Sequence, residues 1–317
     1  MIESVQSDTA LQIFKRGMKL MGNHFEISVV GESMEWADHE IDVAVKEISR
    51  IERLLSTFQE TSETSRINAA AGIEPVPVSE ETFRLIQRSQ RISAITQGAF
   101  DLSYGSVDKS LWNFDTAMTR LPDAATARKM VRLINYRNII LDESAKTVYL
   151  REKGMRIGFG GIGKGYAAER ARQLLKARGV SAGIVNASGD LTTWGTQPDG
   201  SPWTIGIVNP NLRDRVFSYM NVTDMAVATS GNYEKYILVD GVKYSHTINP
   251  KTGLPVRGIK SVTIISPNAE IADAMATPVM IMGMEAGLYM INQMKDIEAI
   301  IIDDRDIIYT SQHIHFT

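Results

Sequence analysis

The sequence predicts an α+β fold with mixed or antiparallel sheets flanked by helices. Segments that alternate apolar and polar residues, as strands do, interleave with segments that repeat their apolar residues at helical spacing. Several predicted strands are joined by tight hairpin turns, which parallel strands cannot use. No Pro-, Gly- or Ser-rich linker divides the 317 residues. We therefore expect a single domain over 1–317, with residues 1–19 as an N-terminal extension.

The first half of the chain contains three predicted helices. Ile41, Val45 and Ile48 recur at helical spacing and indicate the first of them. Ser79 stands at the N-cap position of the second, and Pro122 stands at the start of the third. In chain order we expect a strand at 21–30, a helix at 36–55, a polar loop at 56–71, helices at 79–96 and 122–134, and a hairpin of strands at 138–142 and 146–150.

The second half contains the strongest turn signal, Asp240-Gly241, between two predicted strands. Residues 228–233 are expected to form a small polar loop. In chain order we expect a strand at 155–159, a helix at 166–178, strands at 183–187 and 203–208, a hairpin of 236–239 and 242–247, a strand at 261–266, a mostly helical segment at 269–284, and strands at 297–303 and 307–310.

The composition excludes several classes of protein. With no cysteine, the chain has no disulfide, no catalytic thiolate and no Cys-based metal site. Its net charge of −3, without a Lys/Arg block, argues against nucleic-acid binding, and its five histidines form no HExxH-type pair. No apolar run reaches the roughly 18 residues of a transmembrane helix, and residues 1–19 lack the apolar core of a secretory signal. We expect a soluble protein whose compartment is unknown.

The segment Gly158–Gly165, GFGGIGKG, is the most distinctive in the chain. It satisfies the Rossmann pattern GxGxxG, but the acidic residue expected about 20 residues further on is missing, because Asp190 comes too late. It also satisfies GxxxxGK, but Gly165 stands where a Walker A loop needs Ser or Thr. The glycines can simply allow tight packing. We favour an additional role, in which bare backbone N–H groups and Lys164 bind phosphate.

Asp273 and Thr277 are four residues apart, so they share one face of the predicted helix. A carboxylate and a hydroxyl are oxygen ligands suited to Mg²⁺, which needs few protein anions beside substrate phosphates. The equal alternative is that Asp273 caps the helix or faces solvent while Thr277 bonds back into its helix. Pro278 disfavours regular helix at Thr277 and frees a backbone carbonyl nearby.

Three further segments are candidates for binding. His246 ends a predicted strand, where it can take a proton near neutral pH, although a lone histidine is more often structural. Thr229 and Ser230 offer hydroxyl and backbone donors, with an ordinary turn as the alternative. Phe100 and Asp101 place an aromatic ring beside a carboxylate. Each segment is uninformative alone.

Taken together, these segments resemble the ApbE family, the FAD:protein FMN transferases. The resemblance runs from Met21 to about Asp304, and its motifs follow the family's order. The motifs are Met21-Gly22, Phe58, Ser65–Asn68, Ala99–Asp101, Gly160–Ala167, Asn186–Asp190, Ala228–Gly231, Ser245-His246, Asn249–Gly253, and Ala272–Ala274 with Thr277. Each motif is weak, but their shared order is strong evidence.

The resemblance implies a bilobed α+β fold with FAD in the cleft. It implies that Asp273 and Thr277 bind Mg²⁺ and that the backbone carbonyl of Gly161 completes the metal site. The positions that match the family's flavin- and adenosine-binding residues are Met21, Phe58, Ala99, Phe100, Asp101, Gly158, Lys164 and His246, to which we add Thr229 and Ser230.

The chain departs from the family pattern at three positions. The family usually has Asp where this chain has Gly158, so one polar contact to FAD is lost. Asn249 replaces the usual Asp of the turn after His246 and removes a negative charge near that imidazole. Ser188 replaces the first glycine of a Gly-Gly pair. None of these changes removes a predicted metal ligand.

The function that the resemblance implies is a Mg²⁺-dependent transferase. It would cleave the FAD pyrophosphate, attach FMN to a threonine of an acceptor flavoprotein and release AMP. His246 is our candidate base, with Asp273 as the alternative, and Lys164 adds electrostatic stabilisation. The family usually acts at the cell envelope on redox membrane complexes, so we expect the acceptor to be a subunit of one. The alternatives are an FAD pyrophosphatase that uses water, a non-catalytic FAD-binding protein and a nicotinamide oxidoreductase.

Overall fold

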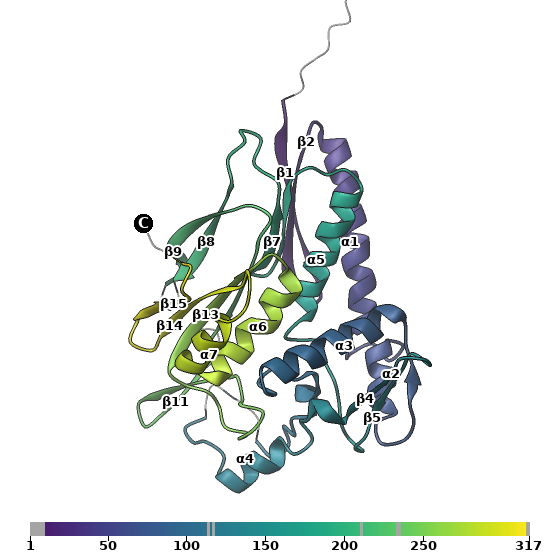
Figure 1. Ribbon diagram of the computed structural model, residues 1–317, viewed down its shortest axis with the longest axis vertical. Helices are drawn as coiled ribbons and strands as arrows, with labels where there is room; N and C mark the ends of the chain where they lie inside the picture. The colour runs from purple at the N-terminus through teal and green to yellow at the C-terminus, as the bar shows by residue number, and fades with distance from the viewer. Residues whose placement is uncertain (1–9, 113–114, 116–117, 210–211, 233–235, 315–317) are drawn as a thin grey trace, which may run out of the picture.

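The centre of the molecule is an eight-stranded sheet in which every neighbouring pair of strands is antiparallel (Figure 1). The computed structural model describes residues 10–112, 115, 118–209, 212–232 and 236–314. Across the sheet the strands are β1 (Gln12–Leu20), β2 (Asn23–Gly31), β6 (Gly183–Ala187), β7 (Asp190–Trp194), β10 (Ala226–Gly231), β13 (Ile259–Ser266), β14 (Glu298–Asp303) and β15 (Ile308–Thr310).

Helices cover one face of this sheet and a hairpin covers the other (Figure 1). The helices are α1 (Met34–Leu55), α5 (Gly163–Ala177) and α6 (Ala269–Met282), and α6 is followed by the shorter α7 (Met284–Ile291). On the opposite face, the hairpin of β8 (Trp203–Asn209) and β9 (Leu212–Val222) packs Trp203 and Ile205 against Val227 of the sheet. The sheet therefore lies between two apolar layers, as expected for a large α+β domain.

The remaining elements form a smaller lobe beside the C-terminal end of α1 (Figure 1). A third apolar cluster, which includes Met130, Val131, Ile237 and Ile248, joins parts of this lobe that are far apart in sequence. The elements are α2 (Glu63–Ala69), β3 (Val76–Pro77), α3 (Glu80–Ile95), the 3₁₀ helix η1 (Leu102–Ser106), α4 (Ala124–Met130), the 3₁₀ helix η2 (Tyr136–Asn138), β4 (Ile139–Asp142), β5 (Thr147–Leu150), β11 (Tyr236–Val239) and β12 (Val242–Ser245).

The predicted α+β class is confirmed, and so are most of the predicted elements. The helices predicted at 36–55, 79–96 and 166–178 correspond to α1, α3 and α5, and both predicted hairpins form antiparallel pairs. Strands β1, β3, β7 and β9 and helix α7 were not predicted. Within the described ranges, no helix combines the length and the apolar character that crossing a bilayer requires.

Four element predictions were wrong in extent or type, and the first three concern 56–71, 122–134 and 228–233. The loop predicted at 56–71 contains α2, whose N-terminus is capped by Ser62. With only Thr64 and Ile67 buried, this short helix leaves little periodicity to detect. The helix predicted at 122–134 is confined to α4, and the polar loop predicted at 228–233 is largely strand β10, which pairs with β7 and β13.

The segment 155–159 was predicted to be a strand but has no strand partner. Its alternation is real, because Met155, Ile157 and Phe159 are buried. However, its backbone bonds to side chains: Asn68 donates to the carbonyl of Ile157 over 3.0 Å and accepts from the N–H of Ile157 over 2.7 Å. The alternating pattern of this segment therefore indicated which side chains are buried. It could not indicate that the Asn68 side chain, rather than a neighbouring strand, bonds the backbone of Ile157.

Ser79 caps α3, as predicted, and its removal gives a first testable result. Its hydroxyl accepts from the N–H of Thr82 and donates to Glu63, so it also links α3 to α2. We expect Ser79→Ala to lower the free energy of unfolding by about 1 kcal/mol, as for other N-caps. Urea unfolding would measure this, with Ser181→Ala as the control, because Ser181 is exposed and lies outside any helix. Equal stability of the two variants would contradict the capping role.

Candidate functional site

A cavity with a volume of about 680 Å³ lies where the smaller lobe meets α6. This volume is typical of sites for cofactor-sized ligands. Its walls come from five segments of the chain that are distant in sequence. The lining residues are Thr57, Phe58, Ala99–Leu102, Tyr104, Gly105, Val107, Lys109, Arg156–Gly158, Gly160, Gly161, His246, Thr247, Thr277, Pro278 and Ile281.

Two aromatic residues of the cavity differ sharply in exposure. Phe100 is buried and lies against the glycine cluster, where a Cβ added to Gly161 would be 3.7 Å from its ring. Phe58 is 96% exposed, although it lines the same cavity. A fully exposed phenylalanine gains nothing from packing within the chain. It is therefore available to stack on a planar ligand that enters the cavity.

Asp101 is buried at the edge of this cavity, and both of its carboxylate oxygens have partners. One oxygen accepts from the N–H of Ser103 over 2.8 Å and from its hydroxyl over 2.6 Å, and the other accepts from the N–H of Tyr136 over 2.7 Å. Burial raises the pKa of Asp101 above its ordinary value, and the hydrogen bonds oppose that shift. The side chain thus holds η1 against η2 and shapes the wall.

Asp273 and Thr277 lie on the part of α6 that faces the glycine cluster. Asp273 is buried and accepts a hydrogen bond of 2.8 Å from the N–H of Gly165, at the start of α5. The two helices approach so closely here that a Cβ on residue 165 would lie 2.6 Å from the Cβ of Asp273 and still closer to the carbonyl oxygen of Ala269. Glycine is therefore required at 165 by helix packing, beyond the phosphate-binding role that the sequence indicated.

Pro278 lies inside α6, which continues to Met282. The helix predicted at 269–284 is confirmed, whereas the expectation that Pro278 disfavours regular helix at Thr277 was wrong. Because Pro278 has no N–H, the carbonyl of Ala274 does not receive the helical hydrogen bond from residue 278. The prediction that Pro278 frees a carbonyl rests on this. Packing against the sheet keeps the helix intact despite the missing hydrogen bond.

A polar cluster surrounds Asp273 at this end of the cavity. Lys164 forms an ion pair with the buried Asp190, whose other oxygen accepts from the N–H of Thr229 over 3.3 Å. Ser230 shares a 2.8 Å hydrogen bond with Thr277. Burial and, secondly, the negative charge of Asp190 raise the pKa of Asp273 to about 7, while Lys164 and the Gly165 N–H oppose that shift.

This cluster has the chemistry of a divalent-cation site completed by substrate. Its two buried carboxylates, Asp190 and Asp273, have one nearby lysine to balance them. Across the described ranges, no group of three His, Cys, Asp or Glu side chains could hold a metal ion. Mg²⁺ sites use one or two carboxylates together with hydroxyl, carbonyl and phosphate oxygens. The Asp273 carboxylate, the Thr277 hydroxyl and the Gly161 carbonyl fit that requirement.

His246 is exposed, lies just beyond β12 and lines the same cavity as Thr277 and Pro278 of α6. The following segment is fastened to η1, because the N–H of Ile248 donates to the hydroxyl of Tyr104 over 3.1 Å. Asn249 then organises a turn in which its side chain accepts from the N–H groups of Lys251 and Thr252. Asn249 therefore stabilises the turn through its side-chain oxygen and brings no negative charge.

The structure gathers most of the candidate residues around one cavity. Eight of them line it: Phe58, Ala99, Phe100, Asp101, Gly158, Gly161, His246 and Thr277. Asp273, Lys164, Thr229 and Ser230 do not line it but belong to the polar cluster beside Thr277. Met21 lies against the start of α5, since a Cβ on Gly163 would be 3.7 Å from its terminal methyl group.

Sequence reasoning missed the role of Asp190. Asp190 belongs to the motif Asn186–Asp190, but the only role weighed for it was that of the acidic residue in a Rossmann fold, for which it lies too far along the chain. Its burial opposite Lys164 depends on β7 lying beside β10, and β7 was not predicted. Thr57 and Tyr104 were also missed as lining residues. An aromatic next to a glycine, as in Tyr104-Gly105, is too common to indicate a site without coordinates.

Comparison with known proteins adds a family to this geometry. The model of the ApbE family matches residues 21–301. A protein of Klebsiella pneumoniae (strain 342) named FAD:protein FMN transferase is 35% identical over 274 residues, which cover 85% of this chain and 84% of the relative. The crystal structure of the ApbE protein of Thermotoga maritima matches with a TM-score of 0.84 and 31% identity, covering 95% of this chain and 97% of the other. The apo flavinyl transferase ApbE of Pseudomonas stutzeri matches with a TM-score of 0.82 and 26% identity, covering 96% of each chain.

Proposed function

The chain belongs to the ApbE family, and from that membership we propose that it is an FAD:protein FMN transferase. In this proposal it cleaves the FAD pyrophosphate in the presence of Mg²⁺, attaches the FMN half to a threonine of an acceptor flavoprotein and releases AMP. The observation that carries the proposal is the cavity of about 680 Å³, which is lined by Thr277 of α6 and by Gly161 of the glycine cluster. Asp273 lies beside this lining, hydrogen-bonded to Gly165. The cavity offers room for a dinucleotide and ligands for its metal in one place.

The residues of α6 and the glycine cluster would hold the metal. Asp273, Thr277 and the Gly161 carbonyl supply three oxygens, and Ser230 orients the Thr277 hydroxyl through their shared hydrogen bond. When bound, Mg²⁺ neutralises charge on the pyrophosphate and makes AMP a better leaving group. Lys164 adds a fixed positive charge close to this point, held by Asp190.

His246, which lines the cavity, is the proposed general base. The threonine hydroxyl oxygen would form a bond to the FMN phosphorus as its proton moves to the imidazole. The bond between that phosphorus and the bridging oxygen breaks, and the bridging oxygen leaves with AMP. The exposure of His246 leaves the attacking position open to a protein segment from outside. Water could use the same opening, which would give FMN and AMP instead.

Incubation with FAD and Mg²⁺, with and without candidate acceptors, tests this function. Chromatography would detect AMP, and mass spectrometry of a co-expressed acceptor would detect an added FMN. Transfer predicts both products together. AMP and free FMN without labelled protein would indicate a pyrophosphatase, and FAD binding without AMP would indicate a non-catalytic carrier. By resemblance to the family, the acceptors to test first are flavoprotein subunits of redox membrane complexes at the cell envelope.

Phe58→Ala tests where the flavin binds. Because Phe58 is 96% exposed, its removal should leave stability unchanged but weaken FAD binding by about 10- to 100-fold, the range of one aromatic stacking contact of roughly 1–3 kcal/mol. Quenching of flavin fluorescence on titration would measure the affinity. Tyr289→Ala is the matched control, because Tyr289 is 71% exposed on α7 and does not line the cavity. Equal FAD affinity in both variants would remove Phe58 from the site.

A further inference from the structure

Tyr104 of η1 lines the cavity of about 680 Å³ together with His246 and Thr247. Its phenol hydroxyl accepts a hydrogen bond of 3.1 Å from the backbone N–H of Ile248, two residues after His246. A tyrosine hydroxyl can accept such a bond while its ring lines a cavity. The bond therefore links η1 directly to the segment that carries the proposed general base.

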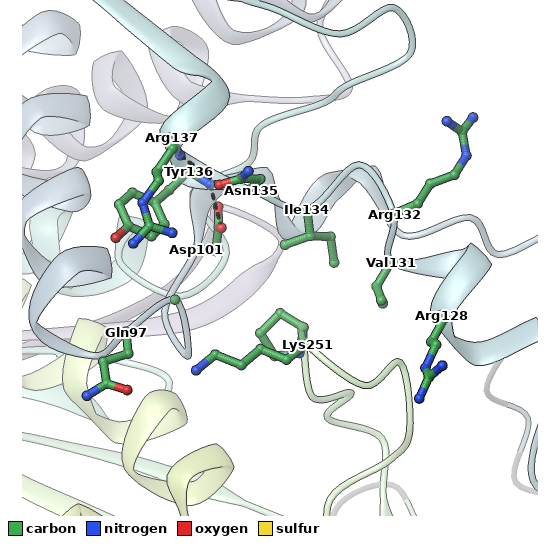
Figure 2. Close-up of a pocket in the computed structure, with 12 residues that line it drawn as sticks. Gln97, Asp101, Arg128, Val131, Arg132, Ile134, Asn135, Tyr136, Arg137 and Lys251 are labelled. Atoms are coloured by element: carbon green, nitrogen blue, oxygen red, sulfur yellow. Dashed lines mark hydrogen bonds between the residues drawn. The ribbon is translucent and has the colours of Figure 1, made fainter. Parts of the chain in front are cut away.

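The 3₁₀ helix η1 is itself held firmly by its neighbours. At its start, the carboxylate of Asp101 accepts a hydrogen bond of 2.7 Å from the N–H of Tyr136, which Figure 2 draws as a dashed line. At its end, the hydroxyl of Ser106 donates to the carbonyl of Arg156 over 3.0 Å and accepts from the N–H of Arg156 over 2.8 Å. A Cβ added to Gly105 would be 3.1 Å from that carbonyl oxygen, so η1 lies directly on residues 156–157. The element can thus serve as a fixed support.

The location of the His246 imidazole depends on the backbone that carries it. The side chain is exposed, so packing around the ring does not hold it in place. Before it, the N–H of the buried Ser245 donates to the carbonyl of Val256 over 2.9 Å. After it, the side chain of Ile248 is buried in the third apolar cluster, and its N–H makes the bond to Tyr104. The imidazole therefore lies between two anchored points.

The turn that follows Ile248 borders open space on its η2 side. A pocket of about 380 Å³, lined by Pro250 and Lys251, separates the turn from η2 (Figure 2). In that view the Lys251 side chain extends across the pocket toward Gln97. The turn thus receives little support from η2. The hydrogen bond to Tyr104 ties the chain to the smaller lobe just before this open region.

We propose that Tyr104 is a positioning residue for the reaction, holding the backbone of 246–248 against η1 so that the His246 imidazole reaches the acceptor hydroxyl. The inference rests on the proposed transferase function. A base acts only within hydrogen-bond reach of the proton that it removes. A misplacement of about 1 Å can cost on the order of 100-fold in rate. Loss of the Tyr104 hydroxyl should therefore slow the chemical step without weakening the binding of FAD.

Tyr104→Phe tests this role, because it removes the hydroxyl and keeps the ring that lines the cavity. At saturating FAD and Mg²⁺ we expect the kcat for AMP release to fall by about 10- to 100-fold. FAD affinity, measured by quenching of flavin fluorescence, should stay at the wild-type value. Tyr149→Phe is the matched control, since Tyr149 belongs to the same lobe, on β5, and does not line the cavity. Both properties of the control should equal those of the wild type.

Two further measurements separate positioning from a general structural effect. Amide exchange followed by NMR should show the N–H of Ile248 exchanging about 2- to 10-fold faster in Tyr104→Phe, as for the loss of one ordinary hydrogen bond, and unchanged in Tyr149→Phe. In a chain that already carries His246→Ala, Tyr104→Phe should cause no further loss of kcat. Two residues that act through one another give such non-additive effects.

The outcomes distinguish this inference from the proposed function. Wild-type kcat in Tyr104→Phe, a loss of FAD affinity as large as the loss of kcat, or an equal further loss in the His246→Ala chain would each overturn the positioning role while leaving the transferase function in place. Absence of AMP from the wild-type chain with every acceptor would refute the proposed function, and the inference with it.

Discussion

Asp273→Asn should abolish Mg²⁺-dependent release of AMP from FAD, with a loss on the order of 1000-fold, because the proposed metal site would lose its carboxylate and metal-ion catalysis contributes several kcal/mol. The substitution removes the charge but keeps an oxygen that can accept from the Gly165 N–H, a bond of 2.8 Å in the native chain. It therefore leaves the packing of α5 on α6 nearly intact. Chromatography of AMP at saturating FAD, across a range of Mg²⁺ concentrations, measures the effect.

A matched substitution tests whether the loss of any buried carboxylate from α6 would have the same effect as the loss of Asp273. Glu270 is another buried carboxylate of α6, but it pairs with Arg88 on α3 at 2.7 Å and lies outside the cavity lining. Glu270→Gln should cost stability while keeping Mg²⁺-dependent AMP release in the folded fraction. Wild-type activity in Asp273→Asn, or equal losses in both variants, would defeat the assignment of Asp273 as a metal ligand.

Gly165→Ala should have the largest effect on stability of the glycine substitutions in the cluster. An added Cβ would lie 2.6 Å from the Cβ of Asp273 and closer still to the backbone carbonyl of Ala269. Neither atom is the flexible end of a side chain, so the two helices must separate. Overpacking of this kind costs typically about 1–3 kcal/mol, and occasionally more. Urea unfolding measures the loss, and displacement of Asp273 should also reduce Mg²⁺-dependent turnover.

Gly160→Ala is the control for that experiment. Gly160 belongs to the same cluster, but a Cβ there would have no atom within 4 Å, and its backbone is not left-handed. Its free energy of unfolding should stay within about 0.5 kcal/mol of the wild type, as for most surface substitutions. If Gly165→Ala were equally harmless, the close approach of α5 and α6 would not be the reason for glycine at 165.

The sequence was sufficient for the fold class, most helices and the residues that meet at the cavity. Helical periodicity and caps located α1 and α3 because those helices each bury one regular face. Strand β10 escaped because its small polar residues serve contacts on neighbouring strands, such as that between Thr229 and Thr263, rather than an alternating pattern. The 155–159 segment misled because burial produced alternation while a side chain supplied the hydrogen bonds.

The sequence could nominate candidate residues for the site, but it could not predict how they contact one another. Family resemblance assigned Asp273, Thr277 and Gly161, but nothing in local pattern places Asp190 opposite Lys164. That contact depends on the order β6-β7-β10 in the sheet, which is a property of the whole chain.

The bond between Gly165 and Asp273 joins residues 108 positions apart, which has a consequence for folding. A growing polypeptide exposes the glycine-rich segment long before α6 exists to receive it, and contacts of such separation form late because a long loop must first close. The chain should thus bind FAD only after α6 has docked. FAD with Mg²⁺ should protect the complete chain against proteolysis, but it should not protect a chain truncated before α6.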